Sequence, residues 1–268
     1  MLKVLRLTTN NLRNFSLFQL NKLFKQAATN RILHNPDTND TDNVATMSNA
    51  ETNGSPEMNG SPTKRAQTQN LDGIVKFMEL LGNLKHLKRT GWVLRNVGDC
   101  ETIAGHMYRM SLMTFLLDGK GDLDRTKCME LALVHDLAES IVGDITPYCG
   151  VSKEDKRQRE MDAMQEITKL IAPRGERLME LFEEYEENET PESKFVKDLD
   201  RLDLVMQAFE YEKRDNCIKT HQEFFDSTDG KFNHPLVVDI VNEIKAQREL
   251  AAEKEEKSQP NHVSANSS

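Results

Sequence analysis

The chain has 268 residues, which is enough for one ordinary domain with flanking segments or for two small domains. Its formal net charge is −9, from 35 basic and 44 acidic residues, and residues 1–36 hold six of the basic residues but no acidic one. The remainder carries −15 (29 basic minus 44 acidic). Such an acidic body is a poor partner for a long polyanion, although one nucleotide in a locally positive pocket is compatible with it.

The cysteines and the apolar residues exclude further classes. The four cysteines lie far apart in the chain and include no CxxC pair: Cys100, Cys128, Cys149 and Cys217. This spacing indicates neither a zinc–thiolate site nor a disulfide framework, so we expect reduced thiols. No run of about 18 apolar residues occurs, and the sequence therefore predicts no membrane-spanning helix.

Three segments lack the apolar residues or the pattern of a folded core. Residues 1–36 are basic and carry Leu and Phe at roughly helical intervals, which is typical of a mitochondrial transit peptide, and RNFS at Arg13–Ser16 resembles a matrix-protease cleavage context. A membrane-surface helix or an unstructured leader of a cytoplasmic protein fits the same composition. Residues 37–70 contain NGSP twice, and residues 251–268 are similarly polar, so we expect a disordered linker and a disordered tail.

Residues 71–250 show a helical repeat of apolar residues. Three clear stripes are formed by Ile74, Phe77, Leu81 and Leu84; by Ile103, Met110, Met113 and Leu117; and by Phe195, Leu199, Leu202, Met206 and Phe209. Helix ends are marked by Gly82, Gly119, Gly143, Pro147, Pro173, Pro191 and Pro235. No convincing alternating strand pattern occurs. We therefore predict a single all-α domain of six or seven helices.

Charged residues interrupt one of the most apolar stretches, ELALVHDLAESIVGDITP at residues 130–147. A buried carboxylate without a partner is costly, so His135 and Asp136 need a compensating charge. His106 and Asp200 interrupt two other apolar stripes in the same way. A divalent cation held by the two imidazoles and the two carboxylates would satisfy all four residues at once.

The order of these residues, a first His, an adjacent His-Asp pair and a later Asp, resembles that of the HD-domain phosphohydrolases. Four blocks extend the resemblance from about residue 72 to 246: GWVLRNVGDCETIAGHMYRM, HDLAESIVGDITP, KFVKDLDRLDLVMQAFEYE and FFDSTDGKFNHP. Together they are similar to the HD domain-containing protein 2 group, relatives of the bacterial 5'-deoxynucleotidases. The resemblance implies an all-α bundle with a metal between helices, bound by His106, His135, Asp136 and Asp200.

The resemblance also implies roles for Glu139 and Asp144, placed to handle the attacking water and the phosphate. With the Ile145 carbonyl they are candidate ligands of a second, weaker cation, for which Mg²⁺ or Mn²⁺ is suited, whereas Mn²⁺, Fe²⁺, Co²⁺ or Zn²⁺ suits the His-rich primary site. Gly143 is expected to end the preceding helix and let the chain turn. We expect Asp198 and Asp203 to form a solvated rim.

Arg89, Trp92 and Arg95 are the candidate substrate-binding residues. An Arg can grip phosphate oxygens with its fork of N–H groups, and an indole can pack on a sugar or base. The bacterial relatives carry an adjacent Arg-Trp pair here, whereas RTGW separates the two residues in this chain. The alternative for Trp92 is a buried ring that anchors a loop.

These inferences predict a phosphoric monoester hydrolase that converts deoxynucleoside 5'-monophosphates to deoxynucleoside and phosphate. Two alternatives remain open at this point. One is another HD phosphohydrolase that acts on nucleoside triphosphates, alarmones or cyclic nucleotides, and the other is a non-catalytic helical interaction protein stabilised by its metal. The resemblance further implies a homodimer.

Overall fold

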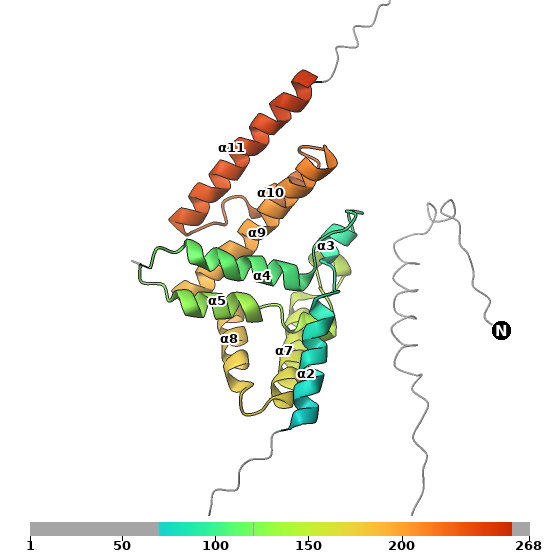
Figure 1. Cartoon of the computed structure of the whole chain (residues 1–268), viewed down its shortest axis with the longest axis vertical. Helices are drawn as coiled ribbons and strands as arrows, with labels where there is room; N and C mark the ends of the chain where they lie inside the picture. The colour runs from blue at the N-terminus through green and yellow to red at the C-terminus, as the bar shows by residue number, and fades with distance from the viewer. Residues whose placement is uncertain (1–69, 120, 259–268) are drawn as a thin grey trace, which may run out of the picture. The chain divides into compact units, whose positions relative to one another are not determined.

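A computed structural model describes residues 70–119 and 121–258. The leader predicted at residues 1–36 and all but the last residue of the linker predicted at 37–70 lie outside the described residues. Within the described ranges the regular elements are helices, and the only strand-like feature is an isolated bridge between Lys88 and Thr102 (Figure 1). The all-α prediction is confirmed.

The described helices follow one another with short connections. Those of ten residues or more are α2 (Leu71–Leu84), α4 (Ile103–Met113), α5 (Arg125–Val134), α7 (Lys153–Leu170), α8 (Glu176–Glu187), α9 (Pro191–Asp215) and α11 (Pro235–Ser258). The shorter ones are α3 (Thr90–Val93), η2 (Thr114–Leu116), α6 (Glu139–Val142), η3 (Pro147–Cys149) and α10 (Gln222–Thr228). None of the described helices combines the length and apolarity needed to cross a membrane.

Short polar side chains fix where several helices begin. The side chains of Asn70, Thr102, Asp124 and Thr190 each accept a hydrogen bond from a backbone N–H in the first turn of α2, α4, α5 and α9, respectively. Each bond satisfies a donor that has no partner inside the helix. The start of α4 matters most, because it sets the register that brings His106 to face the core.

Helix α9 lies at the centre of the fold and packs against α4, α5, α8, α10 and α11 (Figure 1). Its core side chains include Leu199, Leu202 and Val205, all of which are buried. Burial of each such side chain contributes roughly 1.5–3 kcal/mol. Because α9 is covered on several sides, polar residues on more than one of its faces are also removed from solvent.

The C-terminal boundary differs from the prediction. Helix α11 continues to Ser258, whereas a disordered tail was expected from residue 251. Ala251 packs against the hydrophobic core, and Lys257 pairs with Glu253 one turn earlier at 3.5 Å. The residues here are strong helix formers, so the polar composition that suggested disorder is that of a solvated helix.

Candidate metal centre

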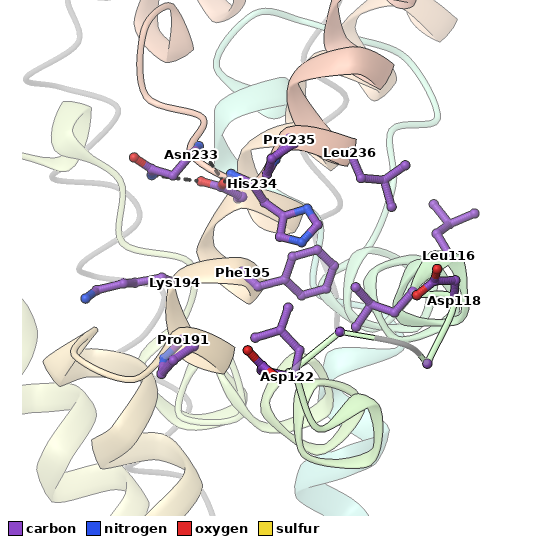
Figure 2. A pocket seen from close by; sticks show the side chains of 15 residues that line it. Leu116, Asp118, Asp122, Pro191, Lys194, Phe195, Asn233, His234, Pro235 and Leu236 are labelled. Atoms are coloured by element: carbon purple, nitrogen blue, oxygen red, sulfur yellow. Dashed lines mark hydrogen bonds between the residues drawn. The ribbon is translucent and has the colours of Figure 1, made fainter.

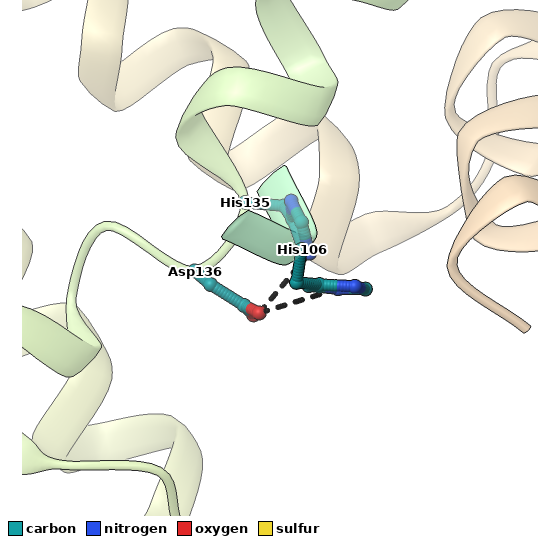
Figure 3. A group of neighbouring side chains, drawn as sticks. All are labelled: His106, His135 and Asp136. Carbon is teal, nitrogen blue, oxygen red and sulfur yellow. Dashed lines mark ion pairs between the residues drawn. The ribbon is translucent and has the colours of Figure 1, made fainter. Parts of the chain in front are cut away.

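Three segments bring the four predicted metal ligands together. His106 lies in α4, His135 and Asp136 directly follow α5, and Asp200 lies in α9. His106 Nε2 is 3.3 Å from Asp200 Oδ1 and 3.8 Å from Asp136 Oδ2, and His135 Nε2 is 3.2 Å from Asp136 Oδ2. Figure 3 shows the Asp136 carboxylate facing both imidazoles, with dashed lines for its two ion pairs. His106, His135 and Asp136 therefore lie close enough together to hold one cation, and Asp200 adjoins this group at His106 Nε2.

The imidazoles are oriented as metal ligands require. The Nδ1 atom of His106 lies 2.6 Å from Asp203 Oδ2, and that of His135 lies 3.0 Å from the carbonyl oxygen of Ala132. Both Nε2 atoms are buried and make no hydrogen bond. A hydrogen bond at one ring nitrogen fixes the tautomer and leaves the other nitrogen free to bind a metal. The donor set fits a divalent cation.

The carboxylates of this site favour positive charge. Burial alone would raise the pKa of Asp136, but His135 and Arg89 hold it well below its usual value. Asp200 behaves likewise, since His106 outweighs the effect of burial and lowers its pKa. Burial lowers the pKa of His106, whereas Asp200 and Asp203 raise it to about 9. Either a proton or a metal ion on His106 Nε2 supplies the charge that the carboxylates require.

The expectation that Asp198 and Asp203 are solvated is wrong, because both side chains are 0 % exposed. Asp203 contacts His106 Nδ1 and forms an ion pair with Arg109. Asp198 instead accepts hydrogen bonds from the backbone N–H groups of Asn233 and His234, at 2.7 and 2.8 Å. A single inward face was assumed for α9, whereas the helix is covered on several sides.

Two further residues contact the ligands. Arg89, which the sequence placed at the substrate, has Nη1 3.3 Å from Asp136 Oδ2. Tyr185 in α8 was not predicted: its hydroxyl donates to Asp200 Oδ2 at 3.2 Å, and its ring centroid is 4.9 Å from that of His135. The only sequence signal at Tyr185 was a polar tip within an apolar stripe, which is also the ordinary pattern of a core tyrosine.

Glu139 and Asp144 lie beside this centre. Glu139 is buried with Oε2 unpaired, and burial, reinforced by the charges of Asp136 and Asp144, raises its pKa well above its usual value. Gly143 ends α6 at φ 77°, as expected, and the turn lets Asp144 Oδ2 accept a hydrogen bond from the Thr90 N–H at 2.7 Å. Burial raises the pKa of Asp144, although Arg89 opposes this. Ile145 follows directly and is half-buried.

A pocket of about 300 Å³ borders the centre, and its lining includes all three candidate substrate-binding residues together with Asp144. Trp92 is 1 % exposed, and its Nε1 donates to Glu101 Oε1 at 2.8 Å, so it anchors the loop as the alternative held. Arg95 contacts none of the four metal-ligand candidates in the described contacts and pairs with Glu223. Only Arg89 of the three reaches the ligands.

A larger cavity of about 630 Å³ lies elsewhere, between α9, the start of α11 and the segment after η2. Figure 2 shows its mainly apolar lining, in which the His234 ring lies against that of Phe195. The centroids of these two rings are 4.8 Å apart. None of the metal-ligand candidates lines it. Volume alone would favour this cavity as the functional site, but the metal-ligand candidates converge beside the smaller pocket, which is therefore the candidate site.

Comparison with known proteins agrees with this geometry. The family model for the HD domain matches residues 81–255. The proteins called 5'-deoxynucleotidase HDDC2 in Mus musculus and Homo sapiens are 47 % and 48 % identical, over 66 % and 65 % of this chain and 88 % and 86 % of their own. A crystal structure from Pyrococcus horikoshii OT3 has a TM-score of 0.54 and 30 % identity, covering 63 % of this chain and 97 % of the other. The chain therefore belongs to the HD-domain family.

Proposed function

We propose that this protein is a metal-dependent 5'-deoxynucleotidase that hydrolyses deoxynucleoside 5'-monophosphates to deoxynucleoside and phosphate. The names of the relatives in Mus musculus and Homo sapiens support the substrate class. The observation that carries the metal dependence is the pair of buried, unpaired Nε2 atoms of His106 and His135 beside two carboxylates. Such a constellation serves hydrolysis of a phosphate ester when a cation occupies it.

We assign the primary cation, Mn²⁺, Fe²⁺, Co²⁺ or Zn²⁺, to His106, His135, Asp136 and Asp200 on the basis of their donor types. Glu139, Asp144 and the Ile145 carbonyl are oxygen donors suited to a second ion, Mg²⁺ or Mn²⁺. When bound, the cation lowers the pKa of water and offsets the charge of the phosphate.

The side chains of this chain have separate tasks in the proposed reaction. Arg89 offers its guanidinium to the phosphate oxygens, because it already lies beside the ligand Asp136. Glu139 or Asp144 orients the attacking water or gives a proton to the leaving 5'-oxygen. Tyr185 and Asp203 hold Asp200 and His106 in place through their hydrogen bonds.

The test combines elemental analysis of the purified protein with phosphate release from mono-, tri- and cyclic nucleotides. We expect bound divalent metal and turnover of deoxynucleoside monophosphates, both lost in His135→Ala. Turnover of triphosphates or cyclic nucleotides alone would assign the site to another HD reaction. Bound metal without turnover of any nucleotide would indicate a protein that keeps the cation for stability.

We also propose a homodimer. Four large apolar residues of α4 and η2 are exposed, and they follow one another closely in the chain: Tyr108, Leu112, Phe115 and Leu116. Exposed apolar side chains of this kind are costly to leave in water and suit an interface between copies. Sedimentation analysis should give a dimer that Leu112→Asp converts to a monomer; a wild-type monomer would refute the proposal.

The basic leader supports a further proposal, import into mitochondria, with the cytoplasm as the alternative. Its residues, 1–36, lie outside the described part of the chain. Cell fractionation and N-terminal sequencing of the mature protein test this: a mitochondrial protein that begins after the leader supports import, whereas an intact N-terminus in the cytoplasmic fraction refutes it.

A further inference from the structure

We propose that the Arg95–Glu223 ion pair, together with Tyr148, recognises the nucleobase of the substrate, and that the phosphate is left to Arg89. This inference rests on the proposed 5'-deoxynucleotidase function and assigns specificity-determining residues to it. Sequence reasoning placed both arginines at the substrate and favoured Arg95 for the phosphate, because the RTGW spacing of Arg89 departs from the Arg-Trp pair of the bacterial relatives. Their surroundings separate them.

Arg95 is paired with a carboxylate and lies against two aromatic rings. Its Nε atom pairs with Glu223 Oε1, its Nη2 donates to Glu223 Oε2 at 2.7 Å, and its Nη1 donates to the Gly91 carbonyl at 3.0 Å. The guanidinium carbon also lies 4.5 Å from the ring centroid of Phe224 and 4.8 Å from that of Tyr148. A bidentate carboxylate neutralises the guanidinium charge, so a phosphate dianion gains little at this position.

Arg89 is in the opposite situation. Its guanidinium contacts Asp136 at 3.3 Å and Glu101 at 3.9 Å, and the first of these is a predicted metal ligand. Asp136 would also be a ligand of a cation at the centre, and N–H groups of Arg89 would then be available for phosphate oxygens. The arginine beside the ligands can therefore change partner when the site is loaded, whereas the Arg95–Glu223 pair has no such competitor among the described contacts.

The pocket connects the two arginines. Its 300 Å³ are lined by Arg89 and Asp144 and also by Arg95, Tyr148 and Glu223. The Tyr148 side chain is 63 % exposed and presents a planar surface, while Phe224 is buried with its ring centroid 4.3 Å from that of Trp92 and forms a fixed support. When the phosphate of a 5'-nucleotide lies at Arg89, its base is the other large group that the pocket must accommodate. The part of the lining formed by Arg95, Tyr148 and Glu223 is available to that base.

The chemistry of this wall fits a base better than a phosphate. Bases stack on aromatic rings and on guanidinium planes whatever their identity. An Arg–Glu pair presents N–H donors next to a carboxylate acceptor, and base edges carry acceptors next to amino or imino donors. The arrangement predicts recognition of bases in general, because the pair offers both kinds of hydrogen bond.

The test compares deoxynucleoside monophosphates with 2-deoxyribose 5-phosphate, which has the same phosphate and sugar but no base. Arg95→Met should lower kcat/KM for the nucleotides roughly tenfold more than it lowers that for the sugar phosphate, and Tyr148→Ala should do the same. Arg89→Met should lower kcat/KM by the same factor for both substrates. If the sugar phosphate turns over too slowly to measure, inhibition by the product deoxynucleoside can be compared between the wild type and Arg95→Met. The variant should bind this inhibitor roughly tenfold more weakly.

Arg214 supplies a matched control outside this pocket. It forms a bidentate pair with Asp215, at 2.7 and 2.8 Å, and its guanidinium carbon lies 4.6 Å from the ring centroid of Tyr211, so Arg214→Met removes a carboxylate pair and a ring contact of the same kinds at a residue outside the lining. This variant should leave kcat/KM unchanged for both substrates. Equal losses for nucleotide and sugar phosphate in Arg95→Met would overturn the inference. Absence of nucleotide turnover in the metal-loaded wild type would instead refute the proposed function.

Discussion

Replacing Asp203 by Asn tests whether this buried carboxylate supports the metal centre. In the wild type it faces two donors, His106 Nδ1 at 2.6 Å and the Arg109 guanidinium. Burial would raise the pKa of Asp203, but hydrogen bonds and charge from His106 and Arg109 hold it below its usual value. Asn has one oxygen and one NH₂ group, so it can accept from one of these donors only and opposes the other with N–H groups.

The contacts set the expected magnitude. Loss of a hydrogen bond to a charged group costs about 1.5–3 kcal/mol. Arg109 retains Glu210 and Gln207 as partners, at 2.7 and 2.8 Å, so we expect the free energy of unfolding to fall by the lower value, about 1.5–2 kcal/mol. Groups that orient a metal-binding His typically contribute about 10–100-fold in affinity, equivalent to about 1.4–2.7 kcal/mol. Asp203→Asn should therefore weaken metal binding at least about tenfold.

Two measurements separate these effects: Co²⁺ titration followed by visible absorption, and urea unfolding of the metal-free protein. Asp198→Asn is the matched control, because Asp198 is equally buried on the same helix but binds the backbone of Asn233 and His234. The control should lose stability while keeping its metal affinity. If Asp203→Asn binds Co²⁺ as tightly as the wild type, Asp203 is a structural residue and the reasoning fails.

Three other changes test neighbouring parts of the structure. Tyr185→Phe removes the hydroxyl that donates to Asp200, so Co²⁺ affinity should fall up to about tenfold, and an unchanged titration would contradict this role. Chelation of the metal should lower the melting temperature reversibly, since metal at about 100 times its Kd stabilises by about 2.7 kcal/mol, and calorimetry checks it. Burial would raise the pKa of Glu212, but Arg248 lowers it below 4.5. The stability that the charged Glu212 contributes is present above pH 4.5 and is lost as the pH falls through the folded pKa. In Glu212→Gln the free energy of unfolding, measured with urea, should therefore depend less steeply on pH below 4.5; the same pH dependence as in the wild type would contradict the assignment.

Periodicity was sufficient to predict the helical class, because the apolar stripes of α2, α4 and α9 repeat with the helical period and their caps are short-range signals. It also pointed to the centre, since His106, His135, Asp136 and Asp200 interrupt such stripes, although the resemblance to the HD-domain family was needed to choose Asp200 over Asp198 and Asp203. In the structure His106 contacts Asp136 and Asp200, and His135 contacts Asp136. The local sequence pattern therefore predicts most of the residues that are candidates to bind the metal directly.

The second layer depends on how helices surround one another, which a single-helix pattern does not contain. Asp198 and Asp203 lie two residues before and three after Asp200, and only the packing of α4 and α11 around α9 reveals that both are buried. Arg89 and Arg95 sit six residues apart in one short segment. Their difference arises from Asp136 and Glu223, which are far away in the chain.

The contacts around His106 connect metal binding to the packing of α4 against α9. His106 and Arg109 belong to α4, and their shared partner Asp203 belongs to α9, as does the ligand Asp200. A cation on His106 Nε2 favours a proton on Nδ1, which strengthens the hydrogen bond to Asp203 and with it the junction of the two helices. The ligand side chains and the junction are thus one electrostatic unit, and a change at Asp203 should be felt at both.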